Sequence, residues 1–465
     1  MHLSDLISPL ALGLLCVSAP WAAGQSANQK SRPFADAGKF KMLYDVRQRP
    51  QSVFLHDRLY VVYNGDAKPS ANGKGSAYPM MISYEPASRT FSEPVRLGAN
   101  RSSDHHFSPI IWADEDDHLH VLHGCHRTPG KHLISMHPAV RGRASIHWQE
   151  APQIAPQLSY PTVFQILGGR QLIYYRTGGH TSSWTYRISV DNGKTWVGPE
   201  NDVTDLDSKG RLDWSSYQTK LPSADGEHLH VVYTDYDDNK NWPDPKRFFN
   251  PRYDREVSNE WKYNLSYLKI NLITQEVCNM DGRNMETPID IGNSKSHCEI
   301  WDTEGRGAGV PPAVVLDENG DPAFLHVLSE ESLTSHRYYY VRRVAGDWKQ
   351  SPITHSNHQW NSGYLLRETD GSLHAYLITG AGYLEGGYMD RHGGGRIEEW
   401  VSTDEGNRWS KRRDISPTNE QYAGWRFNNV QPVVRPDGSV VNGMLIFYGW
   451  AAEQNPEATA FLFHE

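Results

Sequence analysis

Short segments that alternate apolar and polar side chains run through the chain from about Phe40 onward, with acidic or glycine-rich turns between them. Such alternation is typical of half-buried strands, whereas an amphipathic helix repeats its apolar positions every three to four residues. One unit recurs, made of a strand, a tight turn and at once a second strand rich in Leu, Val, His and Tyr. Its seven copies are Gln51–Tyr63, Pro109–His123, Pro161–Arg176, Tyr217–Tyr236, Pro311–Val327, Gly363–Leu377 and Gln431–Tyr448. The pattern predicts an all-β protein built from hairpins.

The spacing of these hairpins predicts a repeat architecture. Most copies lie about 45 to 65 residues apart, and a third and usually a weaker fourth strand follow each one. Repeats of this length with four strands are the signature of β-propeller blades. We therefore expect a seven-bladed β-propeller of four-stranded antiparallel blades over residues 36–465. The last strand, Thr459–His464, has no fourth strand after it, and Phe40–Val46 is expected to supply one and close the ring.

Two short motifs support the propeller independently. Ser189–Trp196 and Ser402–Trp409 both match S-x-D-x-G-x-[TR]-W, the Asp box found between the third and fourth strands of propeller blades. In such a turn Asp accepts backbone N–H bonds, Gly takes the positive-φ position and Trp packs underneath. The boxes are specific for the fold and say little about chemistry.

The N-terminal residues have the pattern of a secretory signal. An apolar run from Leu6 to Val17 is followed by the small residues Ala22, Ala23 and Gly24, although Lys and Arg are missing before the run. Cys16 lacks a small residue before it, which argues against a lipoprotein cleavage site. We expect a signal peptide over residues 1–24, a flexible lead over 25–35, no membrane span, and a protein that is secreted or periplasmic.

The formal net charge is −9, which argues against a nucleic-acid-binding protein because such proteins usually present a basic surface. An anionic small molecule or polysaccharide remains possible, since a local basic cleft can attract it against the overall charge. Nothing in the sequence indicates an organic cofactor or an obligate oligomer, and a monomer is expected.

Propeller topology sorts the loops by face. Loops that enter the first strand of a blade and leave its second strand lie on one face, so His106 and His126, at the two ends of one hairpin, should meet there. Other blades offer Tyr, Arg, Asn and Trp at the equivalent places. These rim residues are Asn64, His105, Tyr160, Arg176, Trp214, Tyr217, Asp235, Tyr236, His355, Asn357, His358, Trp360, Asn361, Trp425, Arg426, Asn428 and Asn429. Aromatic faces pack on sugar rings and Arg binds carboxylate or sulfate, so the rim predicts a groove for an anionic glycan.

The residue types in the groove favour one reaction class. We find no pair of carboxylates on the expected active face, which argues against an ordinary glycoside hydrolase. His, Tyr and Arg together suit β-elimination from a uronic acid: Arg neutralises the carboxylate, Tyr or His removes the adjacent proton, and a partner protonates the leaving oxygen.

The order of the motifs adds a family resemblance. The strings D-H-H-F-x-P from Asp104, L-H-V-x-H-G-x-H from Leu119, S-Y-P from Ser159 and Y-Y-R from Tyr174, with the Asp box and Cys298–Thr303, resemble the BNR-type seven-bladed propeller lyases that degrade ulvan. The resemblance covers nearly the whole chain after residue 24. It implies a sulfated rhamnose–uronic acid polysaccharide as substrate.

The resemblance also implies roles for particular residues. His106 and Tyr160 match the proton-transfer residues, Arg176 the residue that neutralises the uronate, and His126 a second active-site histidine. Which of His106 and Tyr160 is base and which is acid stays open. The positions expected to contact substrate are His105, Tyr217, Tyr236, Asn357, His358, Trp360 and Arg426.

The cysteines leave two alternatives. After residue 24 the chain keeps Cys125, Cys278 and Cys298, an odd number, and Cys125 is expected to be a packed free thiol. In an exported protein Cys278 and Cys298 could form a disulfide. The alternative, which the lyase resemblance implies, is a structural zinc ion held by Cys278, Cys298, His336 and a further ligand such as His297.

Two rival functions also stay open at this point. A sialidase-like hydrolase shares Asp boxes, but it needs an arginine triad and a Tyr–Glu pair that we do not find on the rim. A non-catalytic glycan-binding propeller would keep the aromatic platforms without needing the His, Tyr and Arg cluster.

Overall fold

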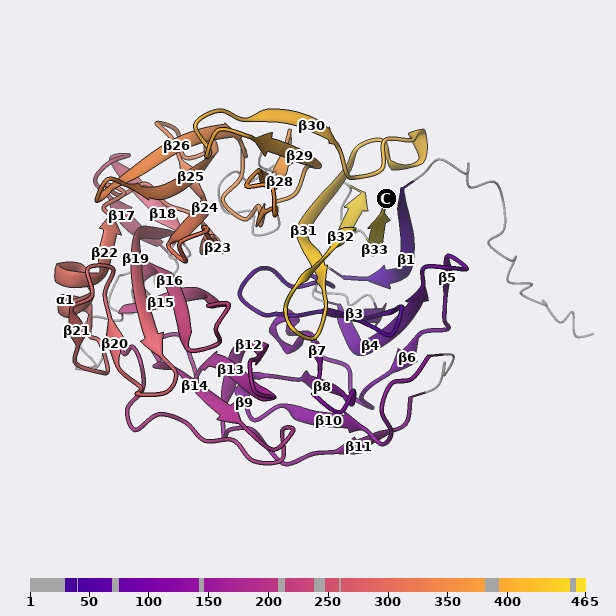
Figure 1. Ribbon diagram of the computed structural model, residues 1–465. Helices are drawn as coiled ribbons and strands as arrows, with labels where there is room; N and C mark the ends of the chain where they lie inside the picture. The colour runs from indigo at the N-terminus through magenta and orange to yellow at the C-terminus, as the bar shows by residue number, and fades with distance from the viewer. Residues whose placement is uncertain are drawn as a thin grey trace, which may run out of the picture.

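The computed structural model describes residues 30–39, 41–68, 75–141, 146–207, 214–237, 247–258, 261–380, 393–451 and 457–465. Within these residues the strands form a ring of seven antiparallel sheets, each one blade, and the chain passes round the ring once from β2 to β33 (Figure 1). The predicted seven-bladed β-propeller is confirmed. Residues 1–24, the expected signal peptide, lie outside the described residues.

The seven predicted hairpins are the first two strands of the seven blades. They are β2 (Ser52–Leu55) with β3 (Arg58–Lys68), β7 (Ile110–Ala113) with β8 (Leu119–His123), β12 (Leu158–Ile166) with β13 (Arg170–Arg176), β15 (Trp214–Pro222) with β16 (His228–Asp237), β23 (Ala313–Leu316) with β24 (Pro322–Ser329), β27 (Tyr364–Arg367) with β28 (Leu373–Thr379), and β31 (Trp425–Val434) with β32 (Val440–Ala451).

The outer strands are more varied. In blade order they are β4 (Ser76–Glu85), β5 (Thr90–Phe91) and β6 (Val95–Arg96); β10 (Lys131–Ser135) and β11 (Trp148–Glu150); β14 (Trp184–Ser189); β19 (Lys262–Asn271), β20 (Val277–Cys278), β21 (Asn284–Met285) and β22 (Glu299–Trp301); β25 (His336–Val344) and β26 (Asp347–His355); β29 (Arg396–Ser402) and β30 (Ser410–Asp414); and β33 (Ala458–His464) with β1 (Ser31–Gly38). The strand β9 (His126–Thr128) pairs with the start of β12, and β17 (Arg247–Asn250) pairs with β18 (Arg255–Ser258). The helical turns are η1 (His105–Phe107), α1 (Ile291–Asn293), η2 (Ser294–Cys298) and η4 (Glu420–Tyr422).

Both Asp boxes have the expected structure. Asp191 Oδ1 accepts the Thr195 N–H at 2.9 Å, and the Trp196 indole donates to the Gly193 carbonyl at 3.1 Å. The second box repeats these contacts with Asp404 and Trp409. The turns are thus held by hydrogen bonds within the motif, and they lie at outer strands of blades three and six.

Ring closure differs in detail from the sequence prediction. The C-terminal strand β33 pairs with β1, with Ser31 opposite Phe463, so an N-terminal segment does complete the last blade (Figure 1). That strand is Ser31–Gly38, however, and it begins inside the segment 25–35 that we expected to be a flexible lead. The predicted closing strand 40–46 was therefore wrong. Apolar alternation in β1 is weak, and its stability comes from pairing with β33 and from Phe34 packing on Phe91.

Residues 41–51, here called the axial segment, lie at the centre of the ring. The Arg49 N–H donates to Pro161 O in blade three, and Gln48 donates to Ser108 O beside blade two. From blade seven, Gln431 donates to Gln51 at 3.1 Å. Contacts with blades on several sides of the ring mean that this segment crosses the axis.

A buried ion pair anchors the axial segment. The Arg47 guanidinium donates to both carboxylate oxygens of Asp45, at 2.7 and 2.6 Å, and both side chains are buried. Burial would raise the pKa of Asp45, but Arg47 outweighs it and holds that pKa well below its usual range. The same carboxylate raises the pKa of Arg47 against the opposing effect of burial.

We expect Asp45→Asn to destabilise the fold by roughly 3–5 kcal/mol, because it leaves the buried Arg47 charge uncompensated. The double variant Asp45→Asn/Arg47→Met should lose less than the sum of the two single variants, by at least about 1 kcal/mol. Urea unfolding of the four proteins gives both quantities. Additive losses would contradict the pairing.

A second buried cation has no such partner. Lys220 in β15 is 6% exposed, and its Nζ lies 5.4 and 5.5 Å from the ring centroids of Tyr174 and Trp184. Among the described residues Nζ has no hydrogen-bond acceptor. Burial lowers the pKa of Lys220 to about 7. The charged form of Lys220 therefore destabilises the folded protein.

Lys220→Met should stabilise the protein at pH 6 by on the order of 2–4 kcal/mol, because burying an ammonium costs free energy that a thioether does not. Between pH 7 and 10 the unfolded chain binds the proton and the folded one does not, so wild-type stability rises with pH. The advantage of the variant should therefore shrink towards pH 10. Unfolding at both pH values tests this, with exposed Lys194→Met as the control; an advantage independent of pH would refute it.

Candidate active site

The register of blade three gathers the predicted catalytic residues. Ser159, in the first strand, lies opposite His126 of β9 on one side and opposite Arg176 of β13 on the other. Tyr160 follows Ser159 and so lies between the imidazole and the guanidinium. Its ring centroid is 5.9 Å from that of His126 and 4.7 Å from Arg176 Cζ. Three positions from separate strands thus meet at the mouth of the ring.

A bulge aims the Tyr160 side chain. Between the pairs Ser159–Arg176 and Thr162–Tyr174, two residues of β12 oppose one residue of β13. Tyr160 takes up the distortion with φ of +56°, a left-handed conformation that costs a tyrosine about 1–3 kcal/mol. Bulges redirect side chains near active sites, and this one turns Tyr160 towards the axis.

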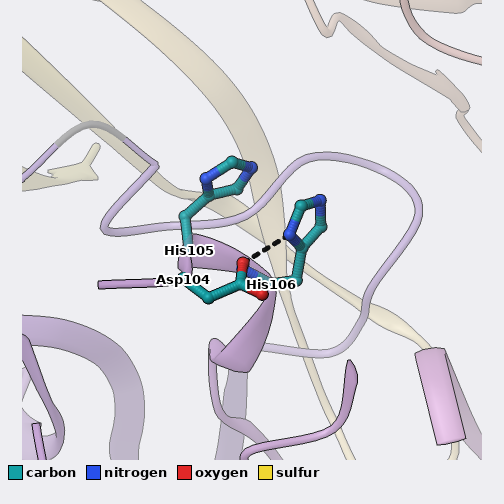
Figure 2. Close-up of side chains that lie close together, drawn as sticks. All are labelled: Asp104, His105 and His106. Atoms are coloured by element: carbon teal, nitrogen blue, oxygen red, sulfur yellow. Dashed lines mark hydrogen bonds and ion pairs between the residues drawn. The ribbon is translucent and has the colours of Figure 1, made fainter. Parts of the chain in front are cut away.

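Asp104 holds two imidazoles at once. It caps the turn η1, and its Oδ1 accepts from His106 Nδ1 at 2.5 Å (Figure 2). Its Oδ2 accepts from His126 Nδ1 at 2.8 Å, and the two rings stack with centroids 4.2 Å apart. Since a carboxylate only accepts, both Nδ1 atoms are donors. The sequence motif contained Asp104, but its role was not predicted.

The protonation of this cluster follows from burial and from Asp104. Burial opposes ionisation of Asp104, but hydrogen bonds from His106 and His126 keep its pKa well below the usual range. Burial lowers the pKa of His106 to about 3 despite the carboxylate, and it lowers the pKa of His105 well below its usual value. His106 is therefore a neutral imidazole near pH 7. His105 stacks on Tyr44 of the axial segment, with centroids 5.8 Å apart.

Arg176 is a buried guanidinium without a carboxylate partner. The side chain is fully buried, and with the described residues it makes one hydrogen bond, from Nη1 to His180 O, which is 3.5 Å long. Nε and Nη2 have no acceptor among the described residues. Two free N–H groups in a fixed fork suit bidentate binding of a ligand carboxylate.

Three tyrosines continue from this arginine towards blade four. The Tyr160 and Tyr217 hydroxyls lie 3.2 Å apart, and the Tyr217 ring centroid is 5.3 Å from that of Tyr236. Burial and the neighbouring Tyr217 raise the pKa of Tyr160 well above its ordinary value, although Arg176 and Arg47 oppose this. Tyr160 is thus a protonated phenol at neutral pH.

Three further cations surround the centre, and sequence reasoning missed all of them. Lys262 Nζ lies 4.7 Å from the ring centroids of both Tyr217 and Trp360. Lys41 Nζ also lies 4.7 Å from Trp360, and Arg47 Cζ is 4.8 Å from Tyr217. The candidate site is therefore locally cationic and aromatic in a protein of net charge −9. Hydrophobic periodicity gives no signal for Lys41 and Arg47, because neither belongs to a blade.

The other predicted contact residues lie farther out. His358 is fully buried, and its Nδ1 accepts the Trp360 N–H at 3.0 Å, so it supports Trp360 from below. Asn357 is a positive-φ residue after β26, and Arg426 lies in β31.

The predicted zinc ligands are not gathered. Cys278 and Cys298 are both free thiols, so the alternative disulfide is absent too. Cys298 packs in the core between blades three and four, His297 accepts a hydrogen bond from Arg283, and His336 packs against Trp261. Among the described residues, no group of three close ligand atoms includes any of these four. Sequence proximity of Cys278 and Cys298 did not reveal that one side chain enters the core. As expected, Cys125 is a buried free thiol.

Two other groups of the described residues have metal-ligand spacing. Asp104, His105 and His106 offer ligand atoms within 4.8 Å of one another, as do Asp225, Glu227 and His228. In the first group the Asp104 oxygens already accept from two imidazoles. The second is an acidic hairpin turn in which Asp225 accepts hydrogen bonds from Ser223 and from the Glu227 N–H.

Comparison with known proteins agrees with this geometry. A profile described as BNR repeat-containing family member matches residues 80–356, more than half of the chain. The chain belongs to this BNR repeat-containing family. Its similarity to ulvan lyases, drawn above from motifs, is confirmed by an ulvan lyase of Alteromonas sp. (strain LOR), 22% identical over 79% of this chain and 75% of that protein. The ulvan lyase-PL25 of Pseudoalteromonas sp. (strain PLSV) is also 22% identical, over 66% of this chain and 62% of that protein.

Solved structures give the same fold for this BNR-family chain. A PL25 ulvan lyase bound to -[GlcA(1-4)Rha3S]- superposes with a TM-score of 0.70 at 17% identity, over 92% of this chain and 94% of that one. The polysaccharide lyase Uly1 superposes with a TM-score of 0.60 at 12% identity, over 91% of both chains.

Asp104→Asn should disturb the tautomers of both histidines, because an amide can donate to Nδ1 as well as accept from it. In the wild-type protein we expect Nδ1 protonated and Nε2 unprotonated in His106 and His126. Long-range ¹H–¹⁵N correlation spectra of the imidazoles report this directly. Unchanged spectra in Asp104→Asn, with the fold intact, would remove the assigned role of Asp104.

Proposed function

We propose that this protein is a polysaccharide lyase that cleaves a uronic-acid-containing polysaccharide by β-elimination, with ulvan as the substrate. Its relatives are named ulvan lyases, and one solved structure holds a glucuronate–rhamnose-3-sulfate chain. The observation that carries the proposal is Arg176, a buried guanidinium with two unpartnered nitrogens beside Tyr160 and the histidine pair. A hydrolase would need two carboxylates flanking the bond. Asp104 and Asp45 are instead engaged with histidines and Arg47.

The reaction follows from the charges of these groups. A uronate carboxylate bound to Arg176 loses most of its negative charge, which acidifies the C–H bond on the adjacent carbon. A base removes that proton, a double bond forms to the next carbon, and the glycosidic bond there breaks. An acid delivers a proton to the leaving oxygen, so the new ends are an unsaturated uronate and a free hydroxyl.

We assign the base to His106 and the acid to Tyr160. His106 is neutral near pH 7, because burial lowers its pKa to about 3, and Asp104 leaves its Nε2 lone pair free. Tyr160 keeps its proton, because its pKa is raised, and Tyr217 lies within hydrogen-bond distance to replace it. The two ring centroids are 5.5 Å apart and nearly perpendicular, so the base and the acid lie next to each other.

The surrounding cations and aromatic rings support a sulfated substrate. Lys41 and Lys262 lie over the buried ring of Trp360, and their positive charges suit a sulfate group. We further propose that the protein is exported by its first 24 residues and acts as a monomer outside the cytoplasm. Among the described residues no helix has the length and apolar character that a bilayer crossing requires.

Incubation with ulvan should release products that absorb in the ultraviolet band of unsaturated uronates.

His106→Ala and Tyr160→Phe should each lower kcat by roughly 10²- to 10⁴-fold, the range of a lost proton-transfer group. Arg176→Lys should lower kcat and raise KM, because it loses the fork, and Asp104→Asn should lower kcat. His137→Ala, an exposed histidine of blade two, is the matched control.

Three results would count against the proposal. Cleavage without the double bond indicates a hydrolase, and binding without cleavage indicates a glycan-binding module. Full activity in both His106→Ala and Tyr160→Phe would refute the assigned roles.

A further inference from the structure

A second cavity lies at the opposite end of the propeller axis. It has a volume of about 930 Å³, and its walls include the first strands of blades three to seven. Its mouth is formed by hairpin turns such as Leu167–Gly169 of blade three, which lie at the far end of that hairpin from Ser159 and Arg176. The axial segment contributes Val46, Arg49 and Pro50, so it separates this cavity from the candidate active site.

Arg49 brings a positive charge to this cavity without a balancing anion. Its side chain makes no hydrogen bond or ion pair with any residue that the structure describes, and its Nη1 is buried without an acceptor. The closest acid in the axial segment, Asp45, is already paired with Arg47. Burial lowers the pKa of Arg49 to about 10, with Asp45 and the Tyr364 hydroxyl acting against it. A guanidinium remains charged under these conditions, and this half-buried one has no anion beside it among the described residues.

The remaining lining is largely apolar. Acidic residues on the lining, Glu368 and Asp437, belong to hairpin turns, and each accepts a hydrogen bond from a neighbouring residue. Arg367 pairs with Glu405, and Arg435 donates to Val440 O. The apolar lining side chains include Val53, Val163, Ile166, Leu221, Val315, Leu366 and Val434. Pockets of this size and character commonly bind small organic ligands.

We propose that this axial cavity is a second binding site, for a small organic carboxylate with an apolar body, whose carboxylate pairs with Arg49. Tyr364, which also lines the cavity, adds a hydroxyl donor for the same group. The apolar body occupies the wall formed by the first strands. This site is independent of the proposed lyase activity, because the axial segment stands between the two.

Isothermal titration with octanoate tests the site. The wild-type protein should bind octanoate, Arg49→Gln should bind it about 10- to 100-fold more weakly, and Arg49→Lys should lie between them. Rim variant Arg435→Gln should bind as wild type does. Arg176→Gln should also bind normally, which separates this cavity from the candidate active site.

Two measurements on the wild-type protein test the site without relying on variants that could misfold. Octanoate should shift the Arg49 Nε–H resonance, whereas 1-octanol, which lacks the charge, should bind at least 10-fold more weakly. The proposal fails if octanoate does not bind, if octanol binds equally well, or if Arg176→Gln rather than Arg49→Gln abolishes binding. Lyase activity of Arg49→Gln on ulvan should equal that of the wild type; loss of activity in a folded variant would show that the two sites are not separate.

Discussion

The ion pair between Asp45 and Arg47 fixes the charge balance at the centre of the ring. Lys41, Arg47, Arg176 and Lys262 all approach the same group of tyrosine and tryptophan rings. Asp45 neutralises Arg47 with two short hydrogen bonds, whereas Arg176 receives no carboxylate from the described protein. Asp45 thus neutralises Arg47, whereas the Arg176 guanidinium stays available to bind a ligand carboxylate. Without Asp45, two uncompensated guanidinium groups would flank Tyr160.

The register of the strands in blade three positions the imidazole, phenol and guanidinium of the candidate site. His126, Ser159 and Arg176 are cross-strand neighbours, so backbone hydrogen bonds set the spacing of imidazole, phenol and guanidinium. Asp104 then couples His126 to His106, which precedes the neighbouring hairpin. A site built in this way depends little on long flexible loops. Its weakest element is the bulge at Tyr160, where the backbone adopts a strained conformation that the surrounding strands must hold.

The sequence was sufficient for the fold because each blade has local signals. Period-two alternation, turn residues and Asp boxes act over fewer than about twenty residues, and they identified all seven hairpins. The grouping of His106, His126, Tyr160 and Arg176 followed from the same logic, since hairpin ends share one face. This logic assigns a residue to one face of the ring, whereas the contacts made on that face come only from the structure.

The features that sequence reasoning missed all depend on distant partners. The strand β1 is held by β33, more than 400 residues away, and its own alternation is weak. The axial segment pairs with blades two, three and seven, so no local period marks it. One signal was available: Asp45 and Arg47 are opposite charges two residues apart, and a turn closed by the Gln48 N–H on Asp45 O brings their side chains together. The zinc prediction rested on the lyase resemblance and on Cys298 and His336 sharing one predicted face, whereas Cys298 packs in the core between blades three and four.

The pairing of β1 with β33 also dictates when the protein becomes competent. During synthesis the nascent chain emerges with β1 and the axial segment first, but the edge on which β1 docks is made only after the six other blades have left the ribosome. Arg47 cannot reach its final surroundings earlier, because Trp360 and Tyr217 also come late. The surroundings of Arg47 are therefore complete only when the later blades have formed, whereas His106, Tyr160 and Arg176 all belong to blades two and three.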